Sequence, residues 1–279
     1  MTLVALTTDH PAWTTAPDGT QTRLMDTGSG LWLATFTPQD GFGLDNLAGS
    51  EDTKPTTSGT RADELPAHLP SLLGAPLAAL GTVLRVPNPS LWDAVSTAIL
   101  RQVVRAAQAR KVYRAWCQTH GTTLNTIHGP LSVVPGPEAV LTLAEKDFKN
   151  VGAAFHRTAL QAAAAAYLDQ GERWRTLTAD QLVIALDDVP RIGPWTASAA
   201  ASDYSGDFSV YPHHDLAVRT WARRIAPDHP WPTTEKEFGT TWRRWADDTR
   251  QLHALTLFTL TWGTTHADDR QHGGTAPQD

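Results

Sequence analysis

The sequence predicts a mainly α-helical protein behind a small N-terminal region that contains β-strands. Three observations support this fold class: apolar residues recur at helical spacing after residue 65, prolines and capping residues open several of these segments, and two alternating stretches near the N-terminus flank a glycine turn. A chain of 279 residues can bury a sizeable core. We expect a β-containing region over 1–45, a flexible linker over 46–64, a helical domain over 65–265 and a polar tail over 266–279.

The composition excludes several classes of protein. With 41% hydrophobic and 19% charged residues and a net charge of −6, the chain is not a uniformly basic nucleic-acid binder. Arg101–Arg114 nevertheless carries cations without an acidic residue. The lone Cys117 excludes an intramolecular disulfide and a multi-cysteine zinc or iron–sulfur site. No apolar run has the length of a membrane span, and residues 1–13 lack a secretion signal, so we expect a cytoplasmic protein without membrane contact.

The N-terminal region shows the pattern of a β-hairpin. Thr22–Asp26 and Leu31–Phe36 alternate as strands do, and 27–30 (Thr-Gly-Ser-Gly) supplies the turn between them. Residues 46–64 are rich in polar, small and acidic residues, which is typical of a linker.

Capping signals mark the helices that follow. Ser90 and Asp93 have capping-box spacing, and apolar residues from Val95 to Val103 predict one helical region that stops near His120–Gly121. Further helices are expected to begin at Pro137, at Arg157, after Thr178, and over 216–225, 235–247 and 252–260.

Residues 186–197 are the most informative segment. A helix ends near Val189, a tight turn runs from Pro190 to Gly193, and Pro194 begins a second helix. The free backbone N–H groups of such a turn and of the new helix can bind a DNA phosphate without reading sequence. By itself the segment is also consistent with a hairpin of two packed helices that does not bind DNA.

The distance in sequence from this segment to Asp215 indicates the function of the segment. Asp215 opens a helix twenty residues after Trp195, where an isolated Asp would be an ordinary N-cap. In this combination the chain resembles the helix–hairpin–helix DNA glycosylase superfamily, above all its 3-methyladenine DNA glycosylase II, or alkylpurine, branch. Residues 191–197 (Arg-Ile-Gly-Pro-Trp-Thr-Ala) correspond to the branch's Gly-Ile-Gly-x-Trp-Thr-Ala, and the resemblance extends over Gly81–Gly263. It implies two helical subdomains around a DNA-binding cleft.

Two features depart from the family pattern. Arg191 stands where the family has the first glycine of the hairpin. A left-handed backbone at Arg191 would cost about 1 kcal/mol. The side chain would either clash with the bound phosphate or form an ion pair with it. The N-terminal region is shorter than the family's β-rich domain and shows no motif match.

The resemblance implies a monofunctional base-excision-repair enzyme that hydrolyses the N-glycosidic bond of alkylated purines in duplex DNA and leaves an abasic site. In that chemistry the ionised carboxylate of Asp215 stabilises positive charge on the sugar and orients or deprotonates the attacking water. Trp195, Tyr211 and Phe258 would contact the flipped-out base. Bifunctional members carry a lysine at the position of Trp195, whereas no lysine lies between 149 and 236 here.

The resemblance also implies a DNA interface. Gln102 and Val103 would wedge into the duplex beside the phosphate-binding Arg101 and Arg105. The predicted hairpin contacts to DNA are Arg191, Ile192, Gly193 and Thr196. A structural Na⁺ or K⁺ is implied at the backbone carbonyls of Asp187, Val189 and Ile192. No other cofactor is expected, and the expected partner is duplex DNA with damaged bases, bound by a monomer.

Other interpretations remain open at this stage. Val103 and the three aromatic residues also suit a helical core, and Arg110, Lys111 and Arg114 also suit a solvated helix face. The alternatives to the alkylpurine interpretation are a non-catalytic DNA-binding or lesion-sensing protein and a glycosylase for another bulky modified base. The small Ser198 and Ala199, one turn beyond Trp195, would leave room for such a base.

Overall fold

The computed structural model describes residues 4–37 and 39–266, which form two compact units. The first unit draws its described residues from 4–9, 58–85 and 212–266, and the second from 10–57 and 86–211. Residues 65–265, which we expected to form a helical domain, contribute to both units. The predicted tail lies, apart from its first residue, outside the described residues.

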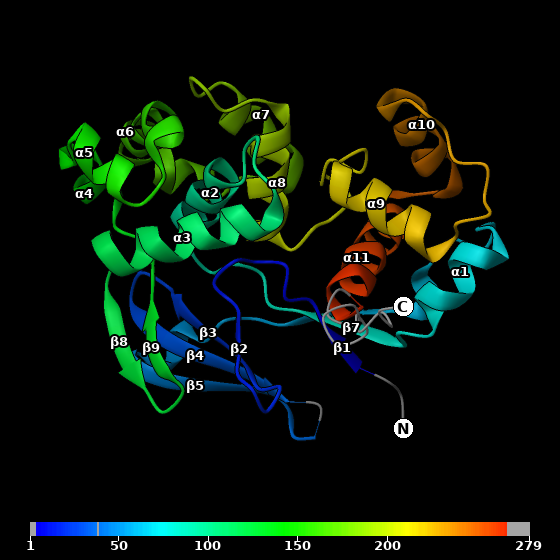
Figure 1. Cartoon of the computed structure of the whole chain (residues 1–279), viewed down its shortest axis with the longest axis horizontal. Helices are drawn as coiled ribbons and strands as arrows, with labels where there is room; N and C mark the ends of the chain where they lie inside the picture. The colour runs from blue at the N-terminus through cyan, green and yellow to red at the C-terminus, as the bar shows by residue number, and fades with distance from the viewer. Residues whose placement is uncertain (1–3, 38, 267–279) are drawn as a thin grey trace, which may run out of the picture. The chain divides into compact units, whose positions relative to one another are not determined.

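An antiparallel sheet of the second unit contains the predicted hairpin. Asp26 lies opposite Leu31, and Gly28 in the connecting turn has a φ of 82°, which favours glycine. A second hairpin packs against the sheet through Leu131, which joins an apolar cluster with Leu24 and Leu33 (Figure 1). The sheet order is β2 (Thr14–Thr15), β3 (Gln21–Asp26), β4 (Gly30–Thr37), β5 (Gly41–Gly49), and the added hairpin is β8 (Thr123–Thr126) with β9 (Gly129–Ser132).

The residues expected to form a flexible linker are largely structured. Strand β5 continues to Gly49, and β6 (Ser58–Arg61) pairs antiparallel with β7 (Thr82–Arg85) in the first unit. Residues 47–49 of β5 and all residues of β6 except Thr60 are exposed, so a polar composition is compatible with strands here and does not by itself indicate a linker.

Helix α2 forms the centre of the second unit. Every residue of α2 except Asp93 is buried, and the helix packs against α6 and α8. The N-cap Ser90 accepts a hydrogen bond from the backbone N–H of Asp93, as the capping signal predicted. The helices of this unit are α2 (Leu91–Leu100), α3 (Ala106–His120), α4 (Pro137–Thr142), α5 (Glu145–Asn150), α6 (Arg157–Trp174), α7 (Ala179–Asp187) and α8 (Pro194–Ser205).

The helical region predicted over 90–120 is interrupted. Helix α2 ends at Leu100 and α3 begins at Ala106, and Val103 between them has a φ of 58° and is 90% exposed. Val103 is therefore not a core residue. Gly121 after α3 has a φ of −91°, so it is not left-handed. Glycine is required there because a Cβ would come within 1.8 Å of the Val133 carbonyl oxygen.

A buried polar network joins the elements of the second unit. The carboxylate of Asp93 accepts hydrogen bonds from Tyr113 (2.9 Å) and Asn88 (3.0 Å), and Arg23, only 1% exposed, lies 3.4 Å from it. Asn88 also donates to Asp203 on α8, at 2.9 Å. Burial and the nearby Asp93 raise the pKa of Tyr113 well above its ordinary value, so its hydroxyl remains a donor. The network joins β3, α2, α3 and α8.

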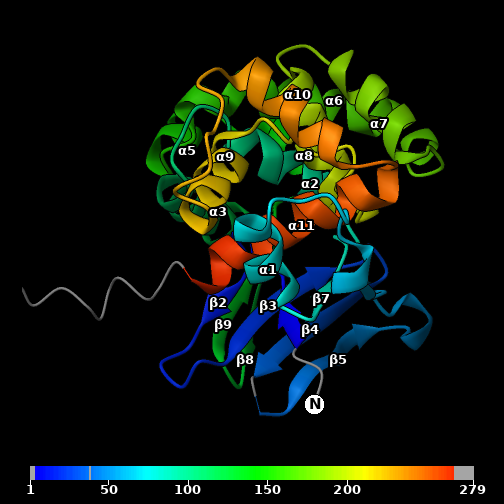
Figure 2. The same ribbon diagram turned by 90° about the vertical axis from the view of Figure 1, so that its right-hand side faces the viewer.

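The first unit combines a small sheet with helices. Val4 lies opposite Thr82, so β1 pairs in parallel with a strand far along the chain instead of joining the other N-terminal strands. Helix α11 packs against α9, α1 and β7 (Figure 2). The elements, besides β6 and β7, are β1 (Val4–Leu6), α1 (Ser71–Ala78), α9 (Leu216–Ile225), α10 (Glu235–Trp245) and α11 (Thr249–Thr265).

Removing the central carboxylate should destabilise the second unit severely. Asp93→Ala leaves the buried Arg23 cation uncompensated, and we expect the free energy of unfolding to fall by about 3–5 kcal/mol. Asp63→Ala, which removes a carboxylate from the exposed ion pair with Arg61, should cost at most about 1 kcal/mol. Urea unfolding measures both losses, and equal losses would show that the network is not stabilising.

Candidate DNA-binding and catalytic site

The predicted hairpin is present between α7 and α8. Helix α7 ends at Asp187, the backbone N–H of Ile192 donates to the Val189 carbonyl at 3.0 Å, and α8 begins at Pro194. The first turn of α8 leaves backbone N–H groups without helical acceptors. A Cβ built on Gly193 would meet no atom within 4 Å, so this backbone is open to a ligand. The arrangement is suited to an anion such as a phosphate.

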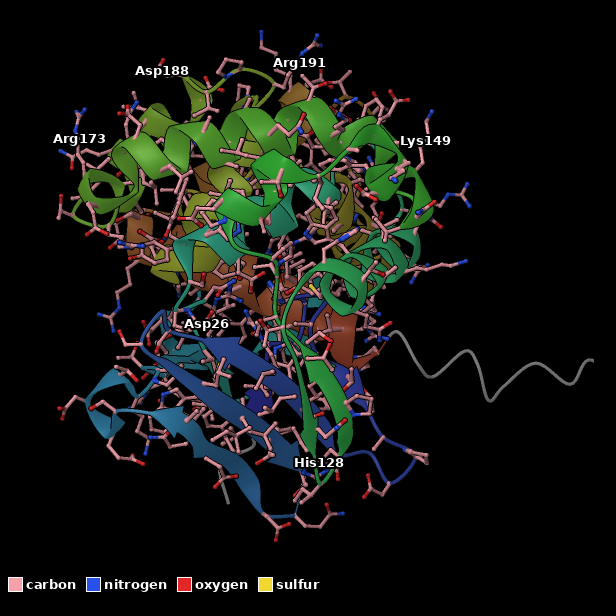
Figure 3. The ribbon with its side chains drawn as sticks, turned by 90° about the vertical axis from the view of Figure 1, so that its left-hand side faces the viewer. Asp26, His128, Lys149, Arg173, Asp188 and Arg191 are labelled. Carbon is pink, nitrogen blue, oxygen red and sulfur yellow. The ribbon has the colours of Figure 1, made fainter. Side chains whose placement is uncertain are left out.

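Arg191 adopts the conformation that the family pattern assigns to glycine. Its φ is 71°, and its exposed side chain projects from the surface near Asp188 (Figure 3). The left-handed backbone is thus retained without glycine, at a cost of about 1–2 kcal/mol. Because the guanidinium extends into solvent, the geometry favours an ion pair between Arg191 and a phosphate over a steric clash between them.

Gln102 connects the hairpin to the loop after α2. Its side-chain amide donates to the Arg191 carbonyl at 3.2 Å and to the Thr196 hydroxyl at 2.8 Å. The two left-handed residues, Val103 and Arg191, therefore flank one side-chain link. The sequence resemblance assigned Gln102 to the wedge, and this linking role carried no sequence signal.

Trp195 lies in the first turn of α8 and is half-buried, so part of its ring is accessible. The Arg101 guanidinium is 6.0 Å from the ring centroid. An indole at this place offers an electron-rich face for stacking. Of the three predicted base-binding aromatics, Trp195 is the most accessible.

The other two aromatic residues lie in the core. Phe258 is 0% exposed on α11, and Tyr211 is 2% exposed and stacks on Phe208 with the ring centroids 5.6 Å apart. Their side chains fill space between packed elements in this structure and present no surface to a base. Periodicity cannot separate a pocket aromatic from a core aromatic, because both lie on the inward face of a helix.

Asp215 is the N-cap of α9, as predicted. Its Oδ2 accepts a hydrogen bond from the Ala217 backbone N–H at 3.0 Å, and its own N–H donates to Pro212 at 2.7 Å. The helix N-terminus favours a negative charge there. The carboxylate is thus held in a fixed orientation, and the side chain is only partly buried.

The predicted basic residues divide into two groups. Arg105, Arg110 and Lys111 are exposed. Arg114 instead donates to the carbonyls of Pro11 (3.3 Å) and Trp13 (2.7 Å), and burial together with Arg110 lowers its pKa. Arg114 therefore anchors the N-terminal segment of the second unit.

The hairpin carbonyls predicted to bind a monovalent cation are compatible with that role. The Val189 carbonyl accepts one hydrogen bond within the turn and retains a second lone pair. Within 4–37 and 39–266, no three His, Cys, Asp or Glu side chains come together as metal ligands. No helix in that part of the chain is long and apolar enough to cross a membrane.

Solved structures with this fold are DNA glycosylases. The 8-oxoguanine glycosylase/lyase of Clostridium acetobutylicum, with duplex DNA, has a TM-score of 0.68 at 12% identity and covers 93% of this chain and 90% of its own. The 3-methyladenine DNA glycosylase of Archaeoglobus fulgidus has a TM-score of 0.65 at 14% identity, covering 95% and 91%. MBOgg1 with a low-affinity DNA ligand has a TM-score of 0.66 at 14% identity, covering 93% and 90%. No family model and no curated sequence matches the chain.

The chain thus has the fold of DNA glycosylases, mainly α-helical with small β regions. The helix–hairpin–helix fold class predicted from the sequence is confirmed. The similarity is equally strong to a 3-methyladenine enzyme and to an 8-oxoguanine enzyme, so fold similarity does not select one branch.

Relieving backbone strain at Val103 should stabilise the protein. Glycine adopts a φ of 58° freely, so Val103→Gly should raise the free energy of unfolding by about 0.5–1 kcal/mol. Ile127 is 93% exposed without a positive φ, so Ile127→Gly should give no gain. Urea unfolding compares the two variants, and a loss of stability in Val103→Gly would contradict the assignment of strain.

Proposed function

We propose that the protein is a monofunctional DNA glycosylase that removes alkylated purines from duplex DNA. The observation that carries this proposal is the placement of Trp195 in the first turn of α8 and of Asp215 at the N-cap of α9, twenty residues apart, on a fold that solved DNA glycosylases share. A DNA-binding protein without catalysis would need neither residue at that spacing.

The proposed reaction breaks the bond between C1′ and the purine nitrogen. An alkylated purine that carries a positive charge takes up the electron pair of the broken bond and departs as a neutral base, so no dedicated general acid is needed. Positive charge develops on the sugar, and the Asp215 carboxylate stabilises it. Water adds its oxygen to C1′ and gives up a proton, for which Asp215 is the acceptor in our proposal. The products are the free base and an abasic site.

Base recognition falls to Trp195 in this proposal. A flipped base would stack on the accessible part of its ring, with an expected contribution of about 1–3 kcal/mol. The exposed Val103 would fill the space left in the duplex, and strained backbone at an exposed residue is typical of a functional site.

Asp215→Asn should abolish base release. The amide still caps α9 but carries no charge to stabilise the sugar cation. We expect the rate of base release from methylated duplex DNA to fall at least about 100-fold. Asp248 caps α11 in the same way, and Asp248→Asn should retain the wild-type rate. If neither the native protein nor Asp215→Asn releases a base while both bind duplex equally, alkylpurine excision is excluded in favour of a DNA-binding protein or another lesion.

Strand cleavage should require alkali. Position 195 offers an indole and no amine, so no Schiff base with C1′ forms there. Incubation of the protein with damaged duplex and borohydride should yield no covalent protein–DNA adduct, and strands should break only after alkali. An adduct would contradict the monofunctional mechanism.

A further inference from the structure

Helix α10 forms one wall of an open groove of about 760 Å³ in the first unit. The groove, called the α10 groove below, is lined by His213, His214, Glu235, Lys236, Gly239, Thr240, Arg243 and Arg244.

The cations of the α10 groove lie on one helix face. Lys236, Thr240 and Arg243 are four and three residues apart, and Arg244 is two turns beyond Lys236. At 1.5 Å per residue the row spans about 11 Å. That length corresponds to about three nucleotides at 3.4 Å per step along one strand.

The charge of the α10 groove is positive. Its one carboxylate, Glu235, pairs with Arg219 of α9 at 2.5 Å and is thereby neutralised. Among the described residues, Lys236, Arg243 and Arg244 form no ion pair, and all three are exposed. In a chain with a net charge of −6, three uncompensated cations on one face constitute a local anion-binding surface.

The α10 groove lies beside the candidate catalytic carboxylate. A Cβ on Gly239 would come within 3.3 Å of the Cβ of His214, so glycine permits close packing between α10 and the loop that ends at Asp215. Helices α9 and α10 lie next to each other in both views (Figures 1 and 2). The groove is therefore lined by His214, the residue directly before Asp215.

We propose that the α10 groove is a second phosphate-binding site, which holds two or three phosphates of the DNA strand next to the nucleotide on which Asp215 acts. This inference rests on the proposed function for its ligand. A row of three cations fits the successive phosphates of a DNA strand, whereas a single small anion would leave most of these cations without a partner. Each unit then has its own phosphate site, the hairpin in one and the α10 groove in the other.

The test measures the salt dependence of binding to undamaged duplex DNA by fluorescence anisotropy. The groove variant Lys236→Gln/Arg243→Gln/Arg244→Gln should reduce the slope of log K against log salt by about 2–3 and weaken binding at least about tenfold at 0.1 M salt. The charge-conserving Lys236→Arg/Arg243→Lys/Arg244→Lys should keep the wild-type slope.

A matched control separates local contacts from total charge. Lys54→Gln/Lys146→Gln/Arg173→Gln removes the same charge from exposed residues outside the groove, of which Arg173 extends from the surface in Figure 3, and should leave the slope unchanged. Equal slopes for the groove and control variants would overturn the inference, even if base release proceeds. A selective loss of slope would support it, even if no base is released. Single-stranded RNA serves as a second probe. If the groove variant loses slope only for binding to this RNA and not for binding to duplex DNA, the inference is also overturned.

Discussion

The carboxylate of Asp93 lies partly buried at the start of α2, where it faces the buried Arg23 and accepts hydrogen bonds from Tyr113 and Asn88. Asn88 extends the network to Asp203, near the end of α8. At the opposite end of the same antiparallel helix pair, Gln102 joins the loop after α2 to Thr196 at the start of α8. The two links fix α2 and α8 at both ends, and the hairpin and the Val103 loop take their positions from that pair. A buried charge is costly unless it is paired, and here the pairs connect β3, α2, α3 and α8.

This fixed pair permits strain at the surface. Val103 and Arg191 both hold left-handed backbones that cost about 1–2 kcal/mol each, and the packed helices beneath them supply the necessary rigidity. In the first unit, by contrast, the N-cap geometry of Asp215 is unstrained, since an Asp at this position is favourable in any helix.

Local signals in the sequence predicted much of the fold. The β3–β4 turn, the Thr178 cap, Pro194 at the start of α8 and the bounds of α9 all follow from chemistry within a few residues. Long-range pairing could not be predicted: β1 pairs with β7, which lies far along the chain, and the largely exposed residues 58–61 also pair with β7. The hairpin and Asp215 were predictable because their spacing is a motif. The burial of Phe258, the exposure of Val103 and the charge balance of the α10 groove depend on tertiary packing, for which helical periodicity gives no sign.

The central claim is that Asp215 stabilises a sugar cation. The most direct measurement compares the affinities of two duplexes, one with a cationic pyrrolidine and one with a neutral tetrahydrofuran in place of the damaged nucleotide. The pyrrolidine imitates the charge of the transition state, so the native protein should bind it at least about tenfold more tightly, and Asp215→Asn should lose that preference. Equal affinity of the native protein for the two duplexes would contradict a catalytic role for Asp215.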